Sequence, residues 1–172
     1  GKFVCEPLER GYGITIGNSL RRIILSSIYG AAIVSVKFDD ALHEYSVISD
    51  VREDVSEIIL NLKELKLMVD DTEDKILTLQ AKGEGSVTGA DIISPDGNVE
   101  ILNPEQHIAT LSKNGVLNMT MVVKTGKGYA LASVNKDDDA PVGTIPIDSV
   151  FAPIKRVKYV VGTSRIGQKT DY

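Results

Sequence analysis

The amino-acid sequence predicts an α+β fold in which a β-rich middle lies between a strand–helix start and a strand at the end. A helical pattern runs from about Thr15 to Ser27, and a strand-like alternation covers residues 154–161. Between them, short apolar runs are separated by turn residues such as Pro95-Asp96-Gly97 and Asn114-Gly115. The 172 residues are enough for one large domain or two small ones.

The amino-terminal part is predicted to contain a short strand, a helix and further strands. Apolar and polar residues alternate weakly over residues 3–6, and Pro7 ends that pattern. After the glycine-containing loop, Thr15 can cap a helix that runs to about Ser27. The next β-rich stretches are expected at residues 31–38 and 42–48.

A second helix is predicted over about residues 52–65. Asp50 with Glu53 three residues later matches a capping box. The apolar residues of this segment form one stripe at helical spacing, namely Val55, Ile58, Ile59, Leu62 and Leu65. The remaining segments read as short strands, at residues 75–82, 86–92, 99–102, 116–124, 143–147 and 154–161.

The first predicted helix has an unusual composition. One face carries Ile16, Leu20, Ile23 and Ile24 with Ser27 beside them, and the opposite face carries Asn18, Arg22, Leu25, Ser26 and Tyr29. The chain has no acidic residue from Gly11 to Gly30. This pattern favours a helix that is covered on more than one side by protein partners, with Arg22 as an interface anchor. An ordinary helix with Arg22 lying over its own core explains the pattern equally well.

We find no residue pattern typical of catalysis, of a metal site or of a bound cofactor. His43 and His107 have no second ligand at metal-binding spacing, and each is expected to be hydrogen-bonded locally. Cys5, the single cysteine, stands in an apolar alternation beside Glu6, so a buried and inert thiol is expected. One cysteine allows no internal disulfide, which favours a reducing compartment.

Charge and hydropathy narrow the possible functions. The net charge of −5 argues against direct binding of a nucleic-acid backbone. No apolar run approaches the ~20 residues that span a bilayer, and the amino end carries no signal-peptide pattern. Two functions other than a binding protein are possible for a chain of this composition. A small β-rich enzyme would need a nucleophile–base pair that the sequence does not show, and a stand-alone nucleic-acid-binding module would need a basic stripe.

Several collinear blocks resemble the N-terminal domain of the bacterial RNA polymerase α subunit family. They extend from one end of the chain to the other, and such a series is more specific than a single motif. The blocks are Glu6-Pro7-Leu8-Glu9-Arg10-Gly11-Tyr12-Gly13, Gly17-Asn18-Ser19-Leu20-Arg21-Arg22, Leu42-His43-Glu44-Tyr45-Ser46, Glu57-Ile58-Ile59-Leu60-Asn61-Leu62-Lys63, Gly89-Ala90-Asp91-Ile92, Gly126-Lys127-Gly128-Tyr129, Val150-Phe151-Ala152-Pro153 and Gln168-Lys169-Thr170-Asp171.

The resemblance implies a two-lobed fold. A dimerisation lobe, with helices on an antiparallel sheet, would consist of residues 1–29 and 153–172, and a β-rich lobe of residues 30–152 would be inserted into it. In that family a further strand precedes Gly1, and a last helix of the dimer interface follows Tyr172. We therefore interpret the chain as a fragment, and dimerisation by this fragment alone stays open.

The resemblance also implies partners and site residues. The family's α subunit is a non-catalytic scaffold that forms a homodimer and recruits the β and β′ subunits of DNA-directed RNA polymerase, a cytoplasmic, nucleoid-associated nucleotidyltransferase. Positions matching the α–α interface are Ile16, Leu20, Ile23, Ile24 and Ser27. Positions matching contacts to the large subunits are Arg22, Leu25, Ser26, Tyr29, Lys63, Ile147 and Ile154. No cofactor, membrane contact or direct DNA contact is expected of this segment.

Overall fold

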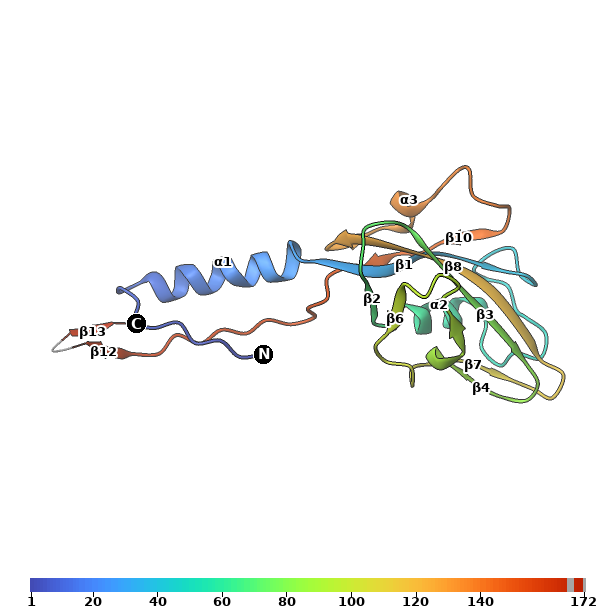
Figure 1. Cartoon of the computed structure of the whole chain (residues 1–172), viewed down its shortest axis with the longest axis horizontal. Coiled ribbons are helices and arrows are strands. Elements are labelled where there is room, and N and C mark those ends of the chain that lie inside the picture. The colour runs from blue at the N-terminus through green and yellow to red at the C-terminus, as the bar shows by residue number, and fades with distance from the viewer. Residues whose placement is uncertain (167–168, 172) are drawn as a thin grey trace.

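The chain folds into a slender arm joined to a β-rich lobe (Figure 1). The computed structural model describes residues 1–166 and 169–171. The helices are α1 (Tyr12–Ser26), α2 (Val55–Lys63) and α3 (Ala132–Asn135), with a short 3-10 turn, η1 (Gly89–Asp91). The strands are β1 (Tyr29–Phe38), β2 (Leu67–Val69), β3 (Lys75–Lys82), β4 (Gly85–Thr88), β5 (Ile92–Ile93), β6 (Val99–Ile101), β7 (His107–Leu111), β8 (Val116–Lys127), β9 (Tyr129–Ala130), β10 (Thr144–Pro146), β11 (Ser149–Val150), β12 (Ser164–Ile166) and β13 (Lys169–Asp171).

The lobe is built around a long antiparallel sheet. Among the described residues seven strands join it in the order β5-β3-β8-β1-β2-β6, with β10 also pairing with β1. The longest pairing joins β1 to β8, from Tyr29 opposite Lys127 to Phe38 opposite Met119. Side chains alternate along these strands, so one face of the sheet is buried. In β8 the inward residues are Leu117, Met119, Met121 and Val123.

Helix α2 closes the core over the buried face of the sheet. Val55, Ile58, Ile59 and Leu62 are buried, as the apolar stripe predicts. They join one hydrophobic cluster with β1, β3, β7 and β8. The α+β class predicted from the sequence is therefore confirmed.

The capping box of α2 lies four residues later than the sequence analysis predicts. Asp54 is the N-cap and accepts a 2.8 Å hydrogen bond from the backbone N–H of Glu57, whose side chain accepts one from Asp54. Asp50 instead has φ of 62°, in a turn whose following residue Val51 bridges to Leu111. The carboxylate of Glu53 is bound to Thr110 and so does not cap a helix.

Several other helices and strands have bounds that differ from those predicted from the sequence. Helix α1 begins at Tyr12 with Gly11 as its N-cap, and the hydroxyl of Thr15 donates to the Gly11 carbonyl inside the first turn. The strands expected at residues 3–6 and 154–161 are extended segments without a ladder of backbone pairs. Residues 42–48 form turns rather than a strand, following a single bridge between Phe38 and Ala41.

Two paired glycines permit close packing where the arm leaves the lobe. Gly30 of β1 lies opposite Gly126 of β8. A Cβ at Gly30 would lie 1.9 Å from the carbonyl oxygen of Phe151, and one at Gly126 would lie 3.0 Å from the Phe151 ring. Phe151 is buried at this position. The chain thus re-enters the arm directly over the sheet because neither strand has a side chain there.

We predict that Asp54→Ala lowers the free energy of unfolding by about 1 kcal/mol, because a backbone N–H of the first turn of α2 loses its acceptor. Urea unfolding measures the change. Glu84→Ala, which alters an exposed carboxylate in the turn between β3 and β4, is the control and should leave stability almost unchanged. Equal stability of the two variants would contradict the observed capping box.

Candidate interaction surfaces

Helix α1 is apolar in sequence, yet none of its residues is buried. It projects from the lobe and lies beside the extended segments that lead from the amino end and toward the carboxyl end (Figure 1). Ile14 is 62 % exposed, Leu20 50 % and Ile23 54 %. A helix covered by its own core would bury these side chains. The exposed aliphatic surface is therefore available to other proteins.

The apolar stripe of α1, comprising Ile16, Leu20, Ile23, Ile24 and Ser27, is only partly covered. Ile16 and Ile24 are half-buried, whereas the other three are exposed. The extended segment 157–161 contacts α1 beside this stripe. The Arg21 Nε donates to the Val157 carbonyl at 3.4 Å, and the ring of Tyr159 lies against Gly17.

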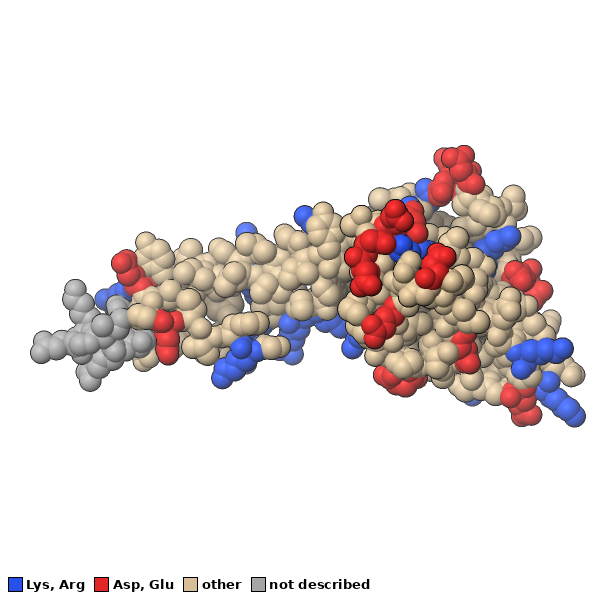
Figure 2. Space-filling model, viewed as in Figure 1, with Lys and Arg blue, Asp and Glu red and all other residues tan. Residues whose placement is uncertain are grey.

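The Arg22 face, comprising Asn18, Arg22, Leu25, Ser26 and Tyr29, is open except at Leu25, which is half-buried. The hydroxyl of Ser26 donates a 2.6 Å hydrogen bond to the Arg22 carbonyl. Tyr29 is 64 % exposed, and the ammonium of Lys127 lies 4.6 Å from the centre of its ring. Figure 2 shows the middle of the arm as largely free of acidic residues, while the lobe carries most of those seen on this side. A local sequence pattern does not reveal Lys127 as part of this face, because its pairing with Tyr29 depends on the register between β1 and β8.

Lys63 and Ile154 lie in neighbouring parts of the surface. Lys63 is exposed at the end of α2, and the next residue, Glu64, forms a 3.4 Å ion pair with Lys155. The backbone N–H of Ala132 and the hydroxyl of Tyr129 hold the pKa of Asp148 below its ordinary value, and the charge of Lys63 adds to this effect. Ile154 is 37 % exposed.

Ile147, by contrast, cannot serve as a contact residue in this conformation. Its side chain is 3 % exposed and belongs to the core cluster. The alternation of β10 and the residues after it explains this correction, because Ile145 and Ile147 both point inward while Pro146 and Asp148 do not. Tyr129, Leu131 and Val150 are exposed apolar residues of the same region that the sequence analysis did not single out.

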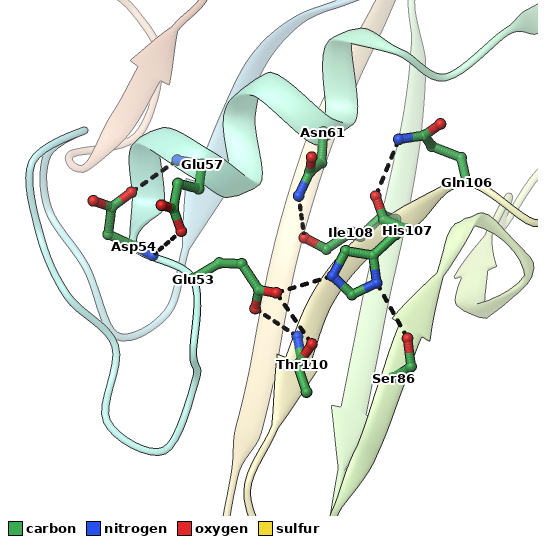
Figure 3. Close-up of polar contacts among 9 residues, drawn as sticks. All are labelled: Glu53, Asp54, Glu57, Asn61, Ser86, Gln106, His107, Ile108 and Thr110. Atoms are coloured by element: carbon green, nitrogen blue, oxygen red, sulfur yellow. Dashed lines mark hydrogen bonds and ion pairs between the residues drawn. The ribbon is translucent and has the colours of Figure 1, made fainter.

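A polar cluster of the lobe lies between the loop before α2 and strands β4 and β7 (Figure 3). Glu53 accepts hydrogen bonds from the Thr110 backbone N–H at 2.6 Å and the Thr110 hydroxyl at 3.1 Å. His107 Nε2 lies 2.9 Å from Glu53, and its Nδ1 lies 3.2 Å from the Ser86 hydroxyl. Burial raises the pKa of the Glu53 carboxyl, but the hydrogen bonds from His107 and Thr110 outweigh it, so the pKa lies below its ordinary value.

This cluster joins three segments and so acts as a structural clamp. A carboxylate, an imidazole and a hydroxyl in a row are also the groups of a nucleophilic triad. Here, however, every oxygen of Glu53 is held by the backbone or side chain of β7, and neither described cavity is lined by Ser86 or His107. The expectation of local hydrogen bonding is confirmed for His43, whose Nδ1 accepts from the Tyr45 backbone N–H at 3.2 Å. His107 is also hydrogen-bonded, but to residues of two distant segments.

The larger cavity, about 670 Å³, lies between the outer face of the sheet and the loop before β10. Its charges are mixed. Lys124 pairs with Asp74 at 3.5 Å, and Lys136 approaches Asp138 at 4.0 Å. Since neither sign of charge dominates, the cavity selects neither an anion nor a cation.

Cys5 is exposed, so the expectation of a buried thiol is wrong. The segment that carries it runs along the arm, where no sheet covers it. Within residues 1–166 and 169–171 no group of three or more His, Cys, Asp or Glu side chains is placed to hold a metal ion. No helix in the same part of the chain is long and apolar enough to cross a membrane.

Comparison with known proteins places the chain among transcription proteins. A family model described as RNA polymerase Rpb3/RpoA insert domain matches residues 36–152. The DNA-directed RNA polymerase subunit alpha of Desulforapulum autotrophicum is 83 % identical over 172 residues, which are all of this chain and 51 % of that protein. The subunit of the same name from Desulfosudis oleivorans is 63 % identical over the same shares. That of Symbiobacterium thermophilum is 58 % identical, with 54 % of it covered. The chain spans about half the length of these curated relatives.

We predict that Glu53→Gln reduces the acid sensitivity of the fold. A carboxyl whose pKa in the folded state lies below its ordinary value of 4.5 stabilises the fold above that value, and this contribution is lost as the pH falls through the folded pKa. Between about pH 6 and about pH 3.5, wild type should therefore lose more stability than Glu53→Gln in urea unfolding. Glu105→Gln, at an exposed position, should follow wild type. The same loss in all three proteins would contradict this role of Glu53.

Proposed function

Because the chain belongs to the RNA polymerase Rpb3/RpoA insert domain family, we propose that it is the assembly scaffold part of a bacterial RNA polymerase α subunit. In this proposal the chain contributes no catalytic residue to nucleotidyl transfer. It forms a homodimer and recruits the β and β′ subunits in the cytoplasm, where the enzyme is associated with the nucleoid. We infer no direct DNA contact for this segment, in keeping with its net charge of −5.

The observation that carries the proposal is the exposure of α1. This 15-residue helix contains six Ile and Leu residues, four of them on its apolar stripe, but has no buried residue. Isolated helices of this length are marginal in water, so packing must supply much of its stability. Full burial of one such side chain contributes about 1.5–3 kcal/mol. Partner chains that cover α1 would supply this missing burial.

The two faces of α1 suit two kinds of partner. The apolar stripe is proposed as the α–α interface, in which a second copy buries Ile16, Leu20, Ile23, Ile24 and Ser27. The Arg22 face is proposed to bind a large subunit, because a guanidinium beside aromatic and aliphatic side chains is a typical anchor of an interface. Lys63 and Ile154 would add contacts from the neighbouring surface.

The division into lobes follows the same proposal. Residues 1–29 and 153–172 would form the dimerisation lobe, and residues 30–152 the inserted lobe. The exposed helix and the close approach of Phe151 to Gly30 support a boundary at this point. Residues 167–168 and 172 of the dimerisation lobe, and with them Gln168 of the resembling blocks, lie outside the described residues.

We predict that Arg22→Ala leaves the fold intact but weakens capture of the β subunit. A central anchor of this kind contributes about 2 kcal/mol or more, which corresponds to roughly a 30-fold loss of affinity. Pull-down of β by the complete protein measures the effect, and circular dichroism checks the fold. Arg52→Ala, at an exposed arginine of the lobe, is the control. Normal capture by Arg22→Ala would refute the assignment.

We also predict that Leu20→Asp weakens self-association while β capture by the remaining dimer persists. A carboxylate in the centre of an apolar interface must lose its hydration without gaining a partner, which costs about 2 kcal/mol or more. Sedimentation equilibrium measures the dissociation constant. Asn18→Asp adds the same charge to the Arg22 face and should self-associate as wild type does. Equal dissociation constants for both variants would place the α–α contact elsewhere.

A further inference from the structure

The aromatic ring of Tyr159 occupies the space that a side chain at position 17 would fill. A Cβ built on Gly17 would lie 2.5 Å from Cδ2 of Tyr159 and 2.8 Å from its Cγ. Real Cβ atoms do not approach other heavy atoms so closely. Glycine is less favourable than alanine within a helix. The intimate contact with the ring is a physical reason for a glycine in the middle of α1.

This contact lies between two other places where segment 157–161 approaches α1. At one end the Arg21 Nε donates to the Val157 carbonyl at 3.4 Å. At the other end Val161 lines a small cavity together with Gly13 and Ile14. Four helical residues rise about 6 Å and two extended residues span about 6.6 Å, so the two segments stay in register as they run antiparallel. Segment 157–161 therefore forms a rail along one side of α1.

The line of contact lies between the two faces of the helix. At about 100° per residue, Leu20 is about 60° around the helix axis from Gly17 on one side, and Arg22 about 140° on the other. If α1 turned about its axis by one residue position, about 100°, the apolar stripe would no longer face its present direction. Other side chains of α1 would then point in that direction instead. The contact that fixes the rotation of α1 about its axis therefore determines which of its residues face a partner chain.

We propose that the contact between Gly17 and Tyr159 locks the rotation of α1 and thereby positions the apolar stripe for a second copy of the chain. Tyr159 is a positioning residue in this scheme, since it acts through α1. The inference rests on the proposed dimerisation. In addition to that dimerisation, the inference requires that segment 157–161 sets the orientation of α1. Helix α1 alone then does not define the α–α surface.

The test is Gly17→Ala in the complete protein. In this variant the higher helix propensity of alanine favours α1, whereas the clash of the added methyl group with the Tyr159 ring disfavours the packing of segment 157–161. Helix propensity alone favours alanine, so α1 would be at least as stable and self-association unchanged. The lock requires the added methyl group to displace the Tyr159 ring, and self-association should then weaken by about tenfold or more. Sedimentation equilibrium measures the dissociation constant, and cleavage after Lys158 by trypsin reports release of segment 157–161.

Matched variants separate this effect from a general loss of structure. Gly162→Ala adds the same methyl group where a Cβ meets nothing within 4 Å, and it should behave as wild type. Tyr159→Phe keeps the ring and should also retain self-association. Tyr159→Leu removes the ring without altering α1, so it should weaken self-association even if Gly17→Ala proves too unstable to purify.

The outcomes distinguish the inference from the proposed function. A dimeric wild type with equally tight self-association of Gly17→Ala, Tyr159→Leu and Gly162→Ala would overturn the lock and leave dimerisation intact. A complete protein that stays monomeric as wild type would overturn both. Weaker self-association of Gly17→Ala and Tyr159→Leu, with Tyr159→Phe unchanged and faster cleavage after Lys158, would establish the lock.

Discussion

The structure depends on a helix that its own chain does not cover. Helix α1 contacts segment 157–161 and has no fully buried residue, so most of its surface is exposed. Apolar side chains on a projecting helix stabilise a protein only when another surface removes them from water. The exposed apolar side chains of the arm are thus the surface on which the proposed partner chains would pack.

The lobe can support such an arm because it has a core of its own. Helix α2 and the long pairing of β1 with β8 bury a continuous apolar cluster. The polar clamp of Glu53, His107 and Ser86 attaches the loop before α2 to β7 and β4. Strand β1 continues directly from the end of α1, so the orientation of the arm is transmitted to the sheet through Tyr29 and Gly30. The core of the lobe thus stabilises the fold, while the proposed contacts with partner chains lie mainly on the arm.

Periodicity predicted the features that depend on one segment alone. The two faces of α1 and the buried stripe of α2 follow from the 3.6-residue repeat, and the strands of the lobe follow from alternation and turns. Features that depend on contacts between distant segments were missed or misplaced. The capping box at Asp50 has the same spacing as the one at Asp54, and only the binding of Glu53 to Thr110 decides between them. Ile147 is buried because β10 joins the sheet, which a local pattern does not reveal.

The arm shows the same limit most clearly. Alternation of Val157, Tyr159 and Val161 predicted a strand, and the side chains do alternate, but their partner is a helix rather than another strand. A helix offers no backbone ladder along its side, so the segment packs through side chains and accepts a hydrogen bond from Arg21. Glycine at position 17 could have suggested this, since a glycine within an otherwise good helix requires a reason outside the helix. Its reason lies more than a hundred residues away, at Tyr159.

The proposed scaffold of two identical chains would have to present different surfaces to two different partners, and the placement of these contacts suits one helix to this task. The rail formed by segment 157–161 lies between the apolar stripe and the Arg22 face, so each face is open on its own side of the rail. A partner that covers one face need not displace the rail or compete for the other face. In the proposed assembly both faces of α1 could therefore be occupied at once. Since both faces lie at fixed angles from the contact with segment 157–161, their positions relative to each other would be set within a single chain.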